Sequence, residues 1–253
     1  MLTLKNGLCL FAEFLVFLSA ASCTEQQGID VSVGHTAVIV VDVQKDFIEG
    51  GSLAVPNSGQ DYIEEVDIAT RRLKSRGFKI LATQDWHPED HISFYTNRDV
   101  SSITADTQAK PQPSEPERLQ TLWPPHCVQY TEGAAILLST NGENKVVDAI
   151  IQKGANPKYD SYSGFQDDGG TETPLNEMLK LAGVKKVLIY GIATDYCVKA
   201  TVMDALKRGY ETALITSLCR GVRLDSTTLA LHEMERAGAA IHTTLDDFLA
   251  GLR

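Results

Sequence analysis

Short apolar runs and amphipathic segments alternate along the chain from residue 36 onward. The first run, 36–41, is apolar and β-branched at nearly every position, which is typical of a strand buried on both faces. The segment 60–76 instead spaces its apolar residues among charges at helical intervals, and Gly77 is suited to end that helix. The pattern therefore predicts a buried strand followed by a surface helix.

The same alternation continues to the end of the chain. Further strands are predicted at 78–83, 146–151, 184–190, 211–215 and 239–242, and further helices at 173–181, 195–207, 226–237 and after 242. Residues 97–121 are polar and rich in proline, so they predict a long surface loop. Strands that alternate with helices form right-handed βαβ units. We therefore predict a three-layer, doubly wound α/β fold, whose mainly parallel six-stranded sheet has helices on both faces.

The length and composition are those of a globular protein with one α/β domain or at most two small ones. Of the 253 residues, 43% are hydrophobic, which is enough for a core and excludes a disordered or collagen-like chain. The net charge is −10 and no cluster of lysines or arginines stands out, so nucleic acid is not an expected partner. Five irregularly spaced cysteines do not indicate a disulfide framework.

The first 30 residues differ from the rest, and we treat them as a leader before a folded domain at 31–253. Residues 8–21 are mostly apolar and end in small residues before Cys23, which resembles a signal peptide or a lipoprotein cleavage box. Glu13 interrupts the stretch, which is also shorter than the ~20 residues of a membrane span. The alternatives are an amphipathic helix, a misassigned start and a leader without function.

An acidic residue follows the first predicted strand. Asp42 comes directly after the buried run, where a carboxylate costs desolvation energy unless it is paired. Burial also raises the pKa of a carboxyl group, which suits a general base. The alternative is a helix or turn cap, for which Asp46 is as well suited as Asp42.

Two candidate metal ligands follow the second strand. Side chains alternate along an extended segment, so Asp85 and His87 lie on the same side of it. His126, beyond the polar loop, is a candidate third ligand. Two imidazoles and one carboxylate form a common open site for zinc, iron or manganese. The alternative is that these histidines, which neighbour prolines in loops, are ordinary surface groups.

Lys153 and Cys197 follow the third and fourth predicted strands. An ammonium group at a strand end can hold a carboxylate or a developing anion, although Lys153 taken alone is better explained as a solvated lysine. Cys197 falls in the first turn of the helix predicted at 195–207, where free N–H groups and the helix dipole stabilise a thiolate or an oxyanion. A buried structural cysteine is the alternative, but the position favours function for Cys197 over Cys127 and Cys219.

Several segments of the chain carry a resemblance to a known family. They are 40–47, 49–53, 85–88, 91–94, 122–128, 153–154, 162–165 and 191–198. Together they make residues 36–242 similar to the nicotinamidase/pyrazinamidase branch of the isochorismatase-like cysteine hydrolase superfamily. The Asp85-Trp86-His87 segment and the segment around His126 point to this branch, because isochorismatases proper lack them.

The resemblance implies roles for the residues already singled out. It implies a catalytic triad of Asp42, Lys153 and Cys197. It also implies one divalent ion, Zn²⁺ or Fe²⁺ with Mn²⁺ as a further option. The ligands of this ion would be Asp85, His87 and His126.

The same resemblance extends to the groups around the substrate. It implies a cis peptide bond before Ala193 and an oxyanion hole made of the N–H groups of Ala193 and Cys197. Residues that match the aromatic positions around the pyridine ring are Phe47, Trp123 and Tyr162. His91 and Ser93 lie near the metal segment in sequence, but the register differs among branches and we assign neither as a ligand.

The implied reaction is the hydrolysis of nicotinamide to nicotinate and ammonia, a step of NAD salvage, with pyrazinamide as a further substrate. One alternative is a related amidase or ureidohydrolase that acts on another small amide. Another is a non-catalytic, ligand-binding member, against which the intact triad and metal set argue. A dehydrogenase is not expected, because no G-x-G-x-x-G follows the first strand.

Free thiols and a salvage role favour a cytoplasmic protein, whereas residues 1–23, if they act as a signal, would lead to export or membrane anchoring. No membrane span is expected in the domain itself. The loop 97–121 is a candidate lid or oligomer contact, so a homo-oligomer is one open possibility.

Overall fold

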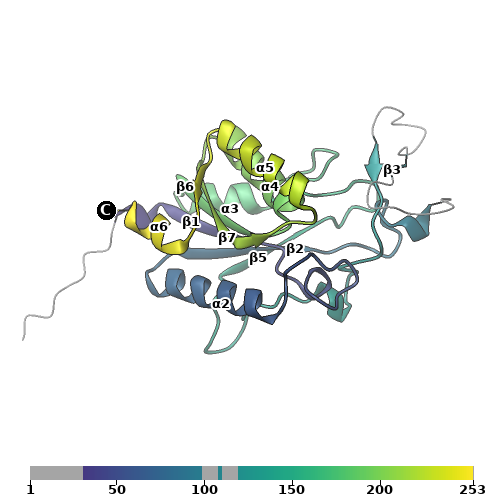
Figure 1. Cartoon of the computed structure of the whole chain (residues 1–253), viewed down its shortest axis with the longest axis horizontal. Helices are drawn as coiled ribbons and strands as arrows, with labels where there is room; N and C mark the ends of the chain where they lie inside the picture. Colours follow the sequence, from purple (N-terminus) through teal and green to yellow (C-terminus); the bar gives the residue numbers. More distant parts are fainter. Residues whose placement is uncertain (1–30, 99–107, 110–118, 253) are drawn as a thin grey trace, which may run out of the picture.

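A parallel sheet forms the centre of the computed structural model, which describes residues 31–98, 108–109 and 119–252 (Figure 1). Its six strands are β1 (Thr36–Val41), β2 (Lys79–Asp85), β5 (Ala149–Lys153), β6 (Lys186–Ile192), β7 (Glu211–Arg220) and β8 (Ala240–His242). All pairs are parallel, in the order β5-β2-β1-β6-β7-β8. The first strand, β1, lies in the middle of the sheet and later strands are added on both sides of it, so the predicted doubly wound fold is confirmed.

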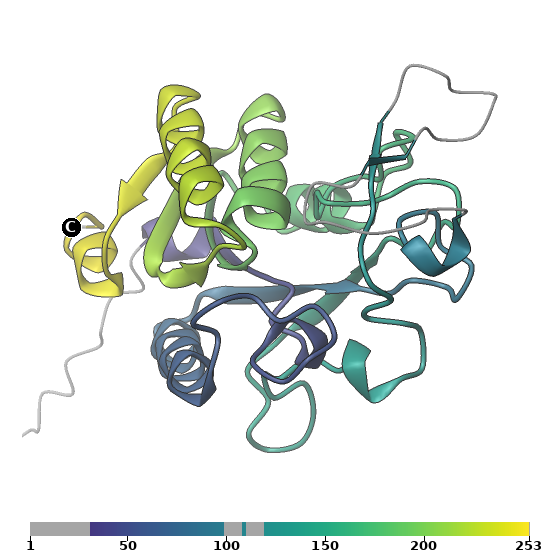
Figure 2. The same ribbon diagram turned by 45° about the vertical axis from the view of Figure 1, so that its right-hand side comes forward.

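Helices cover both faces of this sheet (Figure 2). One face carries α2 (Gln60–Ser75) and α6 (Leu245–Ala250), which are joined by the ion pair Arg72–Asp246. The other face carries α3 (Leu175–Leu181), α4 (Lys199–Lys207) and α5 (Leu224–Arg236). A single helical turn, α1 (Val31–Gly34), precedes β1. The predicted three layers are therefore present.

Two predicted segments lie wholly or largely outside the described residues. The leader 1–30 is one of them, and its role stays a prediction. Within 97–121, the described residues include two short strands, β3 (Gln108–Ala109) and β4 (Gln120–Thr121), which pair antiparallel. Among the described helices, none combines the length and apolarity that crossing a membrane requires.

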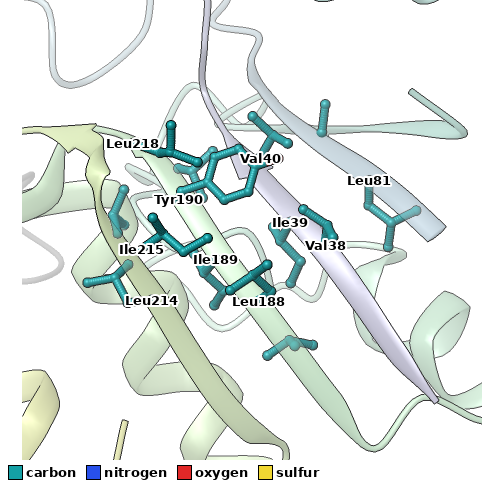
Figure 3. Close-up of a cluster of buried hydrophobic side chains, with 14 of the residues drawn as sticks. Val38, Ile39, Val40, Leu81, Leu188, Ile189, Tyr190, Leu214, Ile215 and Leu218 are labelled. Carbon is teal, nitrogen blue, oxygen red and sulfur yellow. The ribbon is translucent and has the colours of Figure 1, made fainter. Parts of the chain in front are cut away.

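Aliphatic side chains of the central strands fill the core (Figure 3). Every residue of β1 is buried, which explains why its sequence is apolar without alternation. Val38, Ile39 and Val40 lie beside Leu188 and Ile189 of the neighbouring β6 in Figure 3. Each aliphatic side chain buried in this way contributes about 1.5–3 kcal/mol. This core anchors the strands whose polar ends carry the candidate site.

The sequence pattern placed the carboxyl ends of three strands too early. β2, β6 and β7 end at Asp85, Ile192 and Arg220, whereas the predicted strands end at residues 83, 190 and 215. Gln84 and Asp85 at the end of β2 resemble loop sequence but are buried in the sheet. At the end of β7, Thr216 and Arg220 are half-buried and Ser217 is exposed, which explains why the pattern ends that strand early. Sheet pairing therefore extends to the edge where the chemistry is expected.

The strand predicted at 146–151 is displaced in the structure. The N–H groups of Val146 and Val147 bond to the carbonyl of Ser139, so these two residues stay outside the sheet and β5 begins at Ala149. Lys153, predicted to follow this strand, is its last residue. It is paired with the end of β2, which fixes its position rather than leaving it on a loop.

The prediction of an α-helix from residue 195 was wrong in its first turn. Thr194–Val198 form a π-helical turn, closed by a 3.0 Å hydrogen bond from the Val198 N–H to the carbonyl of Ala193. The α-helix α4 begins only at Lys199. Cys197 therefore lies in a wider turn that connects β6 to α4, not in the first turn of an α-helix.

The closest approach of β1 and β6 requires a glycine. Gly191 pairs with Val41 and has a φ of 134°, a backbone conformation that side chains disfavour. A Cβ atom at this position would lie 2.1 Å from the Val41 carbonyl oxygen. A change of side-chain rotamer cannot relieve that overlap, because the neighbouring atoms belong to the backbone of the central strand.

We expect Gly191→Ala to lower the free energy of unfolding by roughly 3 kcal/mol or more, since it combines an unfavourable φ with overpacking of the core. Gly209→Ala is the matched control: its φ is also positive, at 84°, but a Cβ there meets nothing within 4 Å. Its expected cost is about 1 kcal/mol. Denaturant unfolding of both variants measures the difference, and equal costs would contradict the steric argument.

Candidate active site

Four of the predicted residues meet at one edge of the sheet. Asp42 directly follows β1, Asp85 ends β2, Lys153 ends β5 and Cys197 lies just after β6. Asp85 and Lys153 are direct cross-strand partners, so their side chains lie on the same face. The carboxyl ends of neighbouring parallel strands thus bring two carboxylates, an ammonium group and a thiol together.

The ammonium group of Lys153 lies at the centre of this cluster. Its Nζ is 2.9 Å from Asp42 Oδ2 and 3.5 Å from Cys197 Sγ, donates to the carbonyl of Ser161 at 2.7 Å, and pairs with Asp85 Oδ1. Only 2% of Lys153 is exposed, so it is not the solvated lysine considered above. Burial lowers its pKa, but the two carboxylates outweigh burial and hold the pKa well above its usual value. Lys153 therefore carries a buried positive charge.

Asp42 is fully buried and its two carboxylate oxygens have different neighbours. Oδ1 accepts a 2.6 Å hydrogen bond from the Thr83 hydroxyl, and Oδ2 faces Lys153. Burial raises the pKa of Asp42 to about 6, although Lys153 acts in the opposite direction. Asp46 instead accepts a long-range hydrogen bond from the N–H of Cys127 at 2.8 Å.

Cys197 lines a pocket and is almost completely buried. Burial raises the pKa of its thiol well above the usual value, and the nearby ammonium of Lys153 only partly opposes this. The thiol is therefore protonated at neutral pH and needs a base to become a nucleophile. A carboxylate oxygen of Asp42 lies within 4.8 Å of its sulfur.

Ala193 lines the same pocket as Cys197. The peptide bond between Ile192 and Ala193 is cis, as the resemblance implied. The Ala193 carbonyl accepts hydrogen bonds from the N–H groups of Tyr196 and Val198. These bonds hold the second half of the π-helical turn, which includes Cys197, close to Ala193.

Asp85, His87 and His126 form a second cluster beside the first. The Nε2 atoms of His87 and His126 lie 3.5 and 4.0 Å from Asp85 Oδ2. Each Nδ1 bonds a backbone carbonyl, that of Gly154 at 2.9 Å and that of Pro124 at 2.8 Å. A carbonyl can only accept, so each Nδ1 carries a proton and each Nε2 is the ring nitrogen that faces the cluster.

This cluster fits a divalent cation. The three donor atoms converge within 4.8 Å, and hydrogen bonds to carbonyls orient both imidazoles as they do in metal sites. Lys153 and His87 hold the pKa of Asp85 well below its usual value despite burial, so this ligand is ionised. Burial lowers the pKa of His126 to about 4, which keeps that ring neutral. Asp42, Asp85 and Lys153 together leave an excess negative charge, which a cation would offset.

His91 and Ser93 are arranged differently from these ligands. His91 Nε2 bonds the Tyr159 carbonyl at 3.1 Å and its Nδ1 is 2.7 Å from the Ser93 hydroxyl. Both ring nitrogens of His91 are therefore occupied, and the Ser93 hydroxyl is turned toward His91. This arrangement supports leaving both residues out of the ligand set.

An aromatic pocket opens next to the two clusters. It is lined by the three predicted aromatic residues, Phe47, Trp123 and Tyr162, together with Asp85, His126, Ala193 and Cys197. The indole N–H of Trp123 donates to the hydroxyl of Tyr162 at 3.0 Å. The ring of Phe47 lies 5.4 Å from that of His126. A flat ring bound here would have the candidate metal ligands and the thiol in the same pocket.

Sequence reasoning missed several residues of the site. Tyr196 also lines the pocket, with its ring 4.9 Å from that of Trp123, and Asp160 lies there as well. Gln44 bonds both backbone groups of Asp85: its amide donates to the carbonyl at 2.9 Å and accepts from the N–H at 2.7 Å. Tyr196 could have been found from the sequence, because it is the residue next to Cys197. Gln44 could not, because its bonds to Asp85 depend on the pairing of β1 with β2.

Fold and geometry together define a class of protein. It is a doubly wound α/β protein whose sheet edge carries a thiol, a carboxylate and an ammonium group, the set that nucleophilic hydrolysis requires. Residues 36–246 match the isochorismatase domain family. The chain therefore belongs to the isochorismatase family.

Relatives of known activity and structure share this site-bearing region. The nicotinamidase of Escherichia coli K12 is 41% identical over 219 residues, which cover 83% of this chain and 95% of that protein. The pyrazinamidase of Pyrococcus horikoshii, in complex with zinc, has a TM-score of 0.67 and 38% identity, covering 83% of this chain and 99% of that one. The yeast nicotinamidase bound to the inhibitor nicotinaldehyde has a TM-score of 0.71 and 28% identity, covering 83% and 100%.

We expect His126→Ala to lower the metal content of the purified protein at least about tenfold, because it removes one of three ligand side chains. His232→Ala, which removes an exposed histidine of α5, is the control and should leave metal content unchanged. Elemental analysis after dialysis against zinc measures both variants. An unaltered metal content in His126→Ala would refute this ligand assignment.

Proposed function

We propose that this chain hydrolyses nicotinamide to nicotinate and ammonia, and pyrazinamide in the same way. The observation that carries the proposal is the meeting of Cys197, Asp42 and Lys153 beside an aromatic pocket that also contains Asp85 and His126. An aromatic amide bound in this pocket can place its ring between aromatic side chains and its carboxamide at the thiol. The relatives described above are nicotinamidases and pyrazinamidases, which supports this choice of substrate.

In its first half, the reaction joins the thiol to the substrate. Asp42 takes the proton of the Cys197 thiol, and the sulfur attacks the carboxamide carbon to give a tetrahedral intermediate. Lys153, at 3.5 Å from the sulfur, stabilises the negative charge as the proton leaves. The raised pKa of Asp42 makes it a stronger base than an exposed carboxylate.

The second half releases both products. The N–H groups of Ala193 and Cys197 are the proposed donors to the oxyanion, a contribution of about 3–4 kcal/mol per donor in comparable sites. Asp42 returns its proton to the nitrogen, the C–N bond breaks and ammonia leaves. A water molecule then hydrolyses the thioester, which yields nicotinate and restores the thiol.

A divalent ion, Zn²⁺ or Fe²⁺ with Mn²⁺ as a further option, would be held by Asp85, His87 and His126. When bound, it supplies a Lewis acid for the ring nitrogen of the substrate, which orients the ring. Phe47, Trp123 and Tyr162 are the proposed contacts to the two faces and the edge of this ring. The hydrogen bond between Trp123 and Tyr162 holds both side chains in place for that contact.

We expect Cys197→Ala to abolish ammonia release from nicotinamide in the full-length protein, with metal content and unfolding unchanged. Cys219→Ala is a closely matched control, because both thiols are free and both residues are 7% exposed. Its activity should equal that of the unaltered protein. Residual activity of Cys197→Ala within about tenfold would rule out the thiol mechanism. If the unaltered protein releases ammonia only from other amides, the substrate is wrong but the mechanism stands.

We expect kcat/KM to fall about tenfold per pH unit below a pH of about 6, because protonated Asp42 cannot accept the thiol proton. Activity is thus retained above the pKa of Asp42 and lost as the pH falls through it. Metal content measured over the same range separates this effect from loss of the ion through protonation of His126, whose pKa is about 4. A profile that stays flat down to pH 5 would contradict Asp42 as the base.

A further inference from the structure

The carboxylate of Asp42 has to present one particular oxygen to the thiol, and one side chain of β2 determines which oxygen that is. Thr83 Oγ1 accepts the backbone N–H of Asp42 at 3.1 Å and lies 2.6 Å from Asp42 Oδ1. A hydroxyl has one proton, and an N–H can only donate. The Thr83 proton is therefore directed to Oδ1, which leaves Oδ2 on the side of Lys153.

The position of this hydroxyl is fixed by packing. Thr83 is completely buried in β2, and its methyl group lies so close to Gly164 that a Cβ there would be 2.9 Å from Thr83 Cγ2. Gly164 is held in turn by a 3.0 Å hydrogen bond from its N–H to Thr201 Oγ1. Rotation of the Thr83 side chain would break both hydrogen bonds to Asp42 and remove the methyl group from its packing against Gly164.

The same hydroxyl also supports the backbone of Asp42. Asp42 has a φ of 48°, in the left-handed region that residues other than glycine seldom adopt. The bond from its N–H to Thr83 holds this conformation at the point where the chain leaves β1. One threonine thus fixes both the backbone and the side chain of the residue proposed as the base.

We infer that Thr83 is a positioning residue for the reaction: it holds Asp42 so that Oδ2, and not Oδ1, receives the proton of Cys197. The choice of nicotinamide as the substrate in the test rests on the proposed function. The proton transfer from Cys197 to Asp42 can be measured without any substrate. A base displaced by about 1 Å can lose as much as 10²-fold in rate, and that sets the scale of the expected effect.

The test uses Thr83→Val, which removes the hydroxyl but keeps the shape, and Thr83→Ser, which keeps the hydroxyl. We expect Thr83→Val to lower kcat for nicotinamide about 10- to 100-fold, with KM changed less than about threefold and metal content unchanged. Thr83→Ser should recover kcat to within about threefold of the unaltered protein. The matched control is Thr70→Val, since Thr70 is equally buried and hydrogen-bonded but contacts Val66 and Tyr190 instead. It should leave kcat unchanged.

A second measurement needs no substrate. Iodoacetamide forms an S–C bond with Cys197 while iodide leaves and the thiol proton passes to Asp42, and mass spectrometry follows this residue alone. We expect Thr83→Val to slow this alkylation about tenfold or more in the otherwise unaltered protein. In an Asp42→Asn background it should have no further effect, because Thr83 acts through Asp42.

Several outcomes would overturn the inference. They are a kcat of Thr83→Val within twofold of the unaltered protein, a Thr83→Ser variant as slow as Thr83→Val, or equal effects of Thr83→Val with and without Asp42. If Thr83→Val does not fold, Thr83→Ala takes its place in both measurements, since it removes the hydroxyl without placing a methyl group against the carboxylate. Slow turnover of nicotinamide by the unaltered protein, with normal alkylation, would contradict the proposed substrate and not the role of Thr83.

Discussion

The structure of the site depends on one buried ammonium group. Lys153 is in contact with two carboxylates, a backbone carbonyl and a thiol, and its charge makes the burial of both acids tolerable. Without it, Asp42 and Asp85 would repel each other inside the protein, and at least one of them would be protonated. The ammonium group therefore connects the thiol cluster to the metal cluster.

The core of the sheet makes this charge arrangement possible. The apolar residues of β1, β2 and β6 exclude water from the interior next to the strand ends. The charges at those ends therefore interact strongly with one another. The two carboxylates respond in opposite ways to the same ammonium group. Asp42 retains a raised pKa because burial dominates, whereas Asp85 has a lowered pKa because two histidines reinforce the effect of Lys153. Two acids in one cluster are thereby suited to different tasks, one to move a proton and the other to remain a ligand.

The fold was largely predictable from the sequence because its signals are local. The uninterrupted burial of β1 and the alternation of strands and helices determine the doubly wound sheet. The strand ends were harder, because residues such as Gln84 and Lys153 are polar and resemble loop sequence until their partners are known. The π-helical turn at Cys197 has no local signal of this kind either.

Some residues of the candidate site could likewise be predicted from the sequence, and others could not. Asp42, Asp85 and Cys197 can be found because each follows a strand, and the family resemblance adds Ala193 and the aromatic residues. Single-residue patterns do not reveal that Thr83 bonds Asp42 or that Gln44 bonds Asp85, because both bonds depend on the register of β1 against β2. The roles of His91 and Ser93 likewise follow only from how their polar atoms are occupied.

The carbonyl of Gly154 that orients His87 belongs to the residue next to Lys153. A Cβ atom at Gly154 would lie 2.3 Å from the imidazole ring of His87, so only glycine fits there while that histidine keeps its place. Lys153 thus contacts the thiol cluster through its side chain, and the adjacent Gly154 orients a candidate metal ligand through its backbone. Gly154 also has a φ of 68°, in the left-handed region that favours glycine. The ring of His87 and the backbone conformation therefore both disfavour a side chain beside the buried lysine.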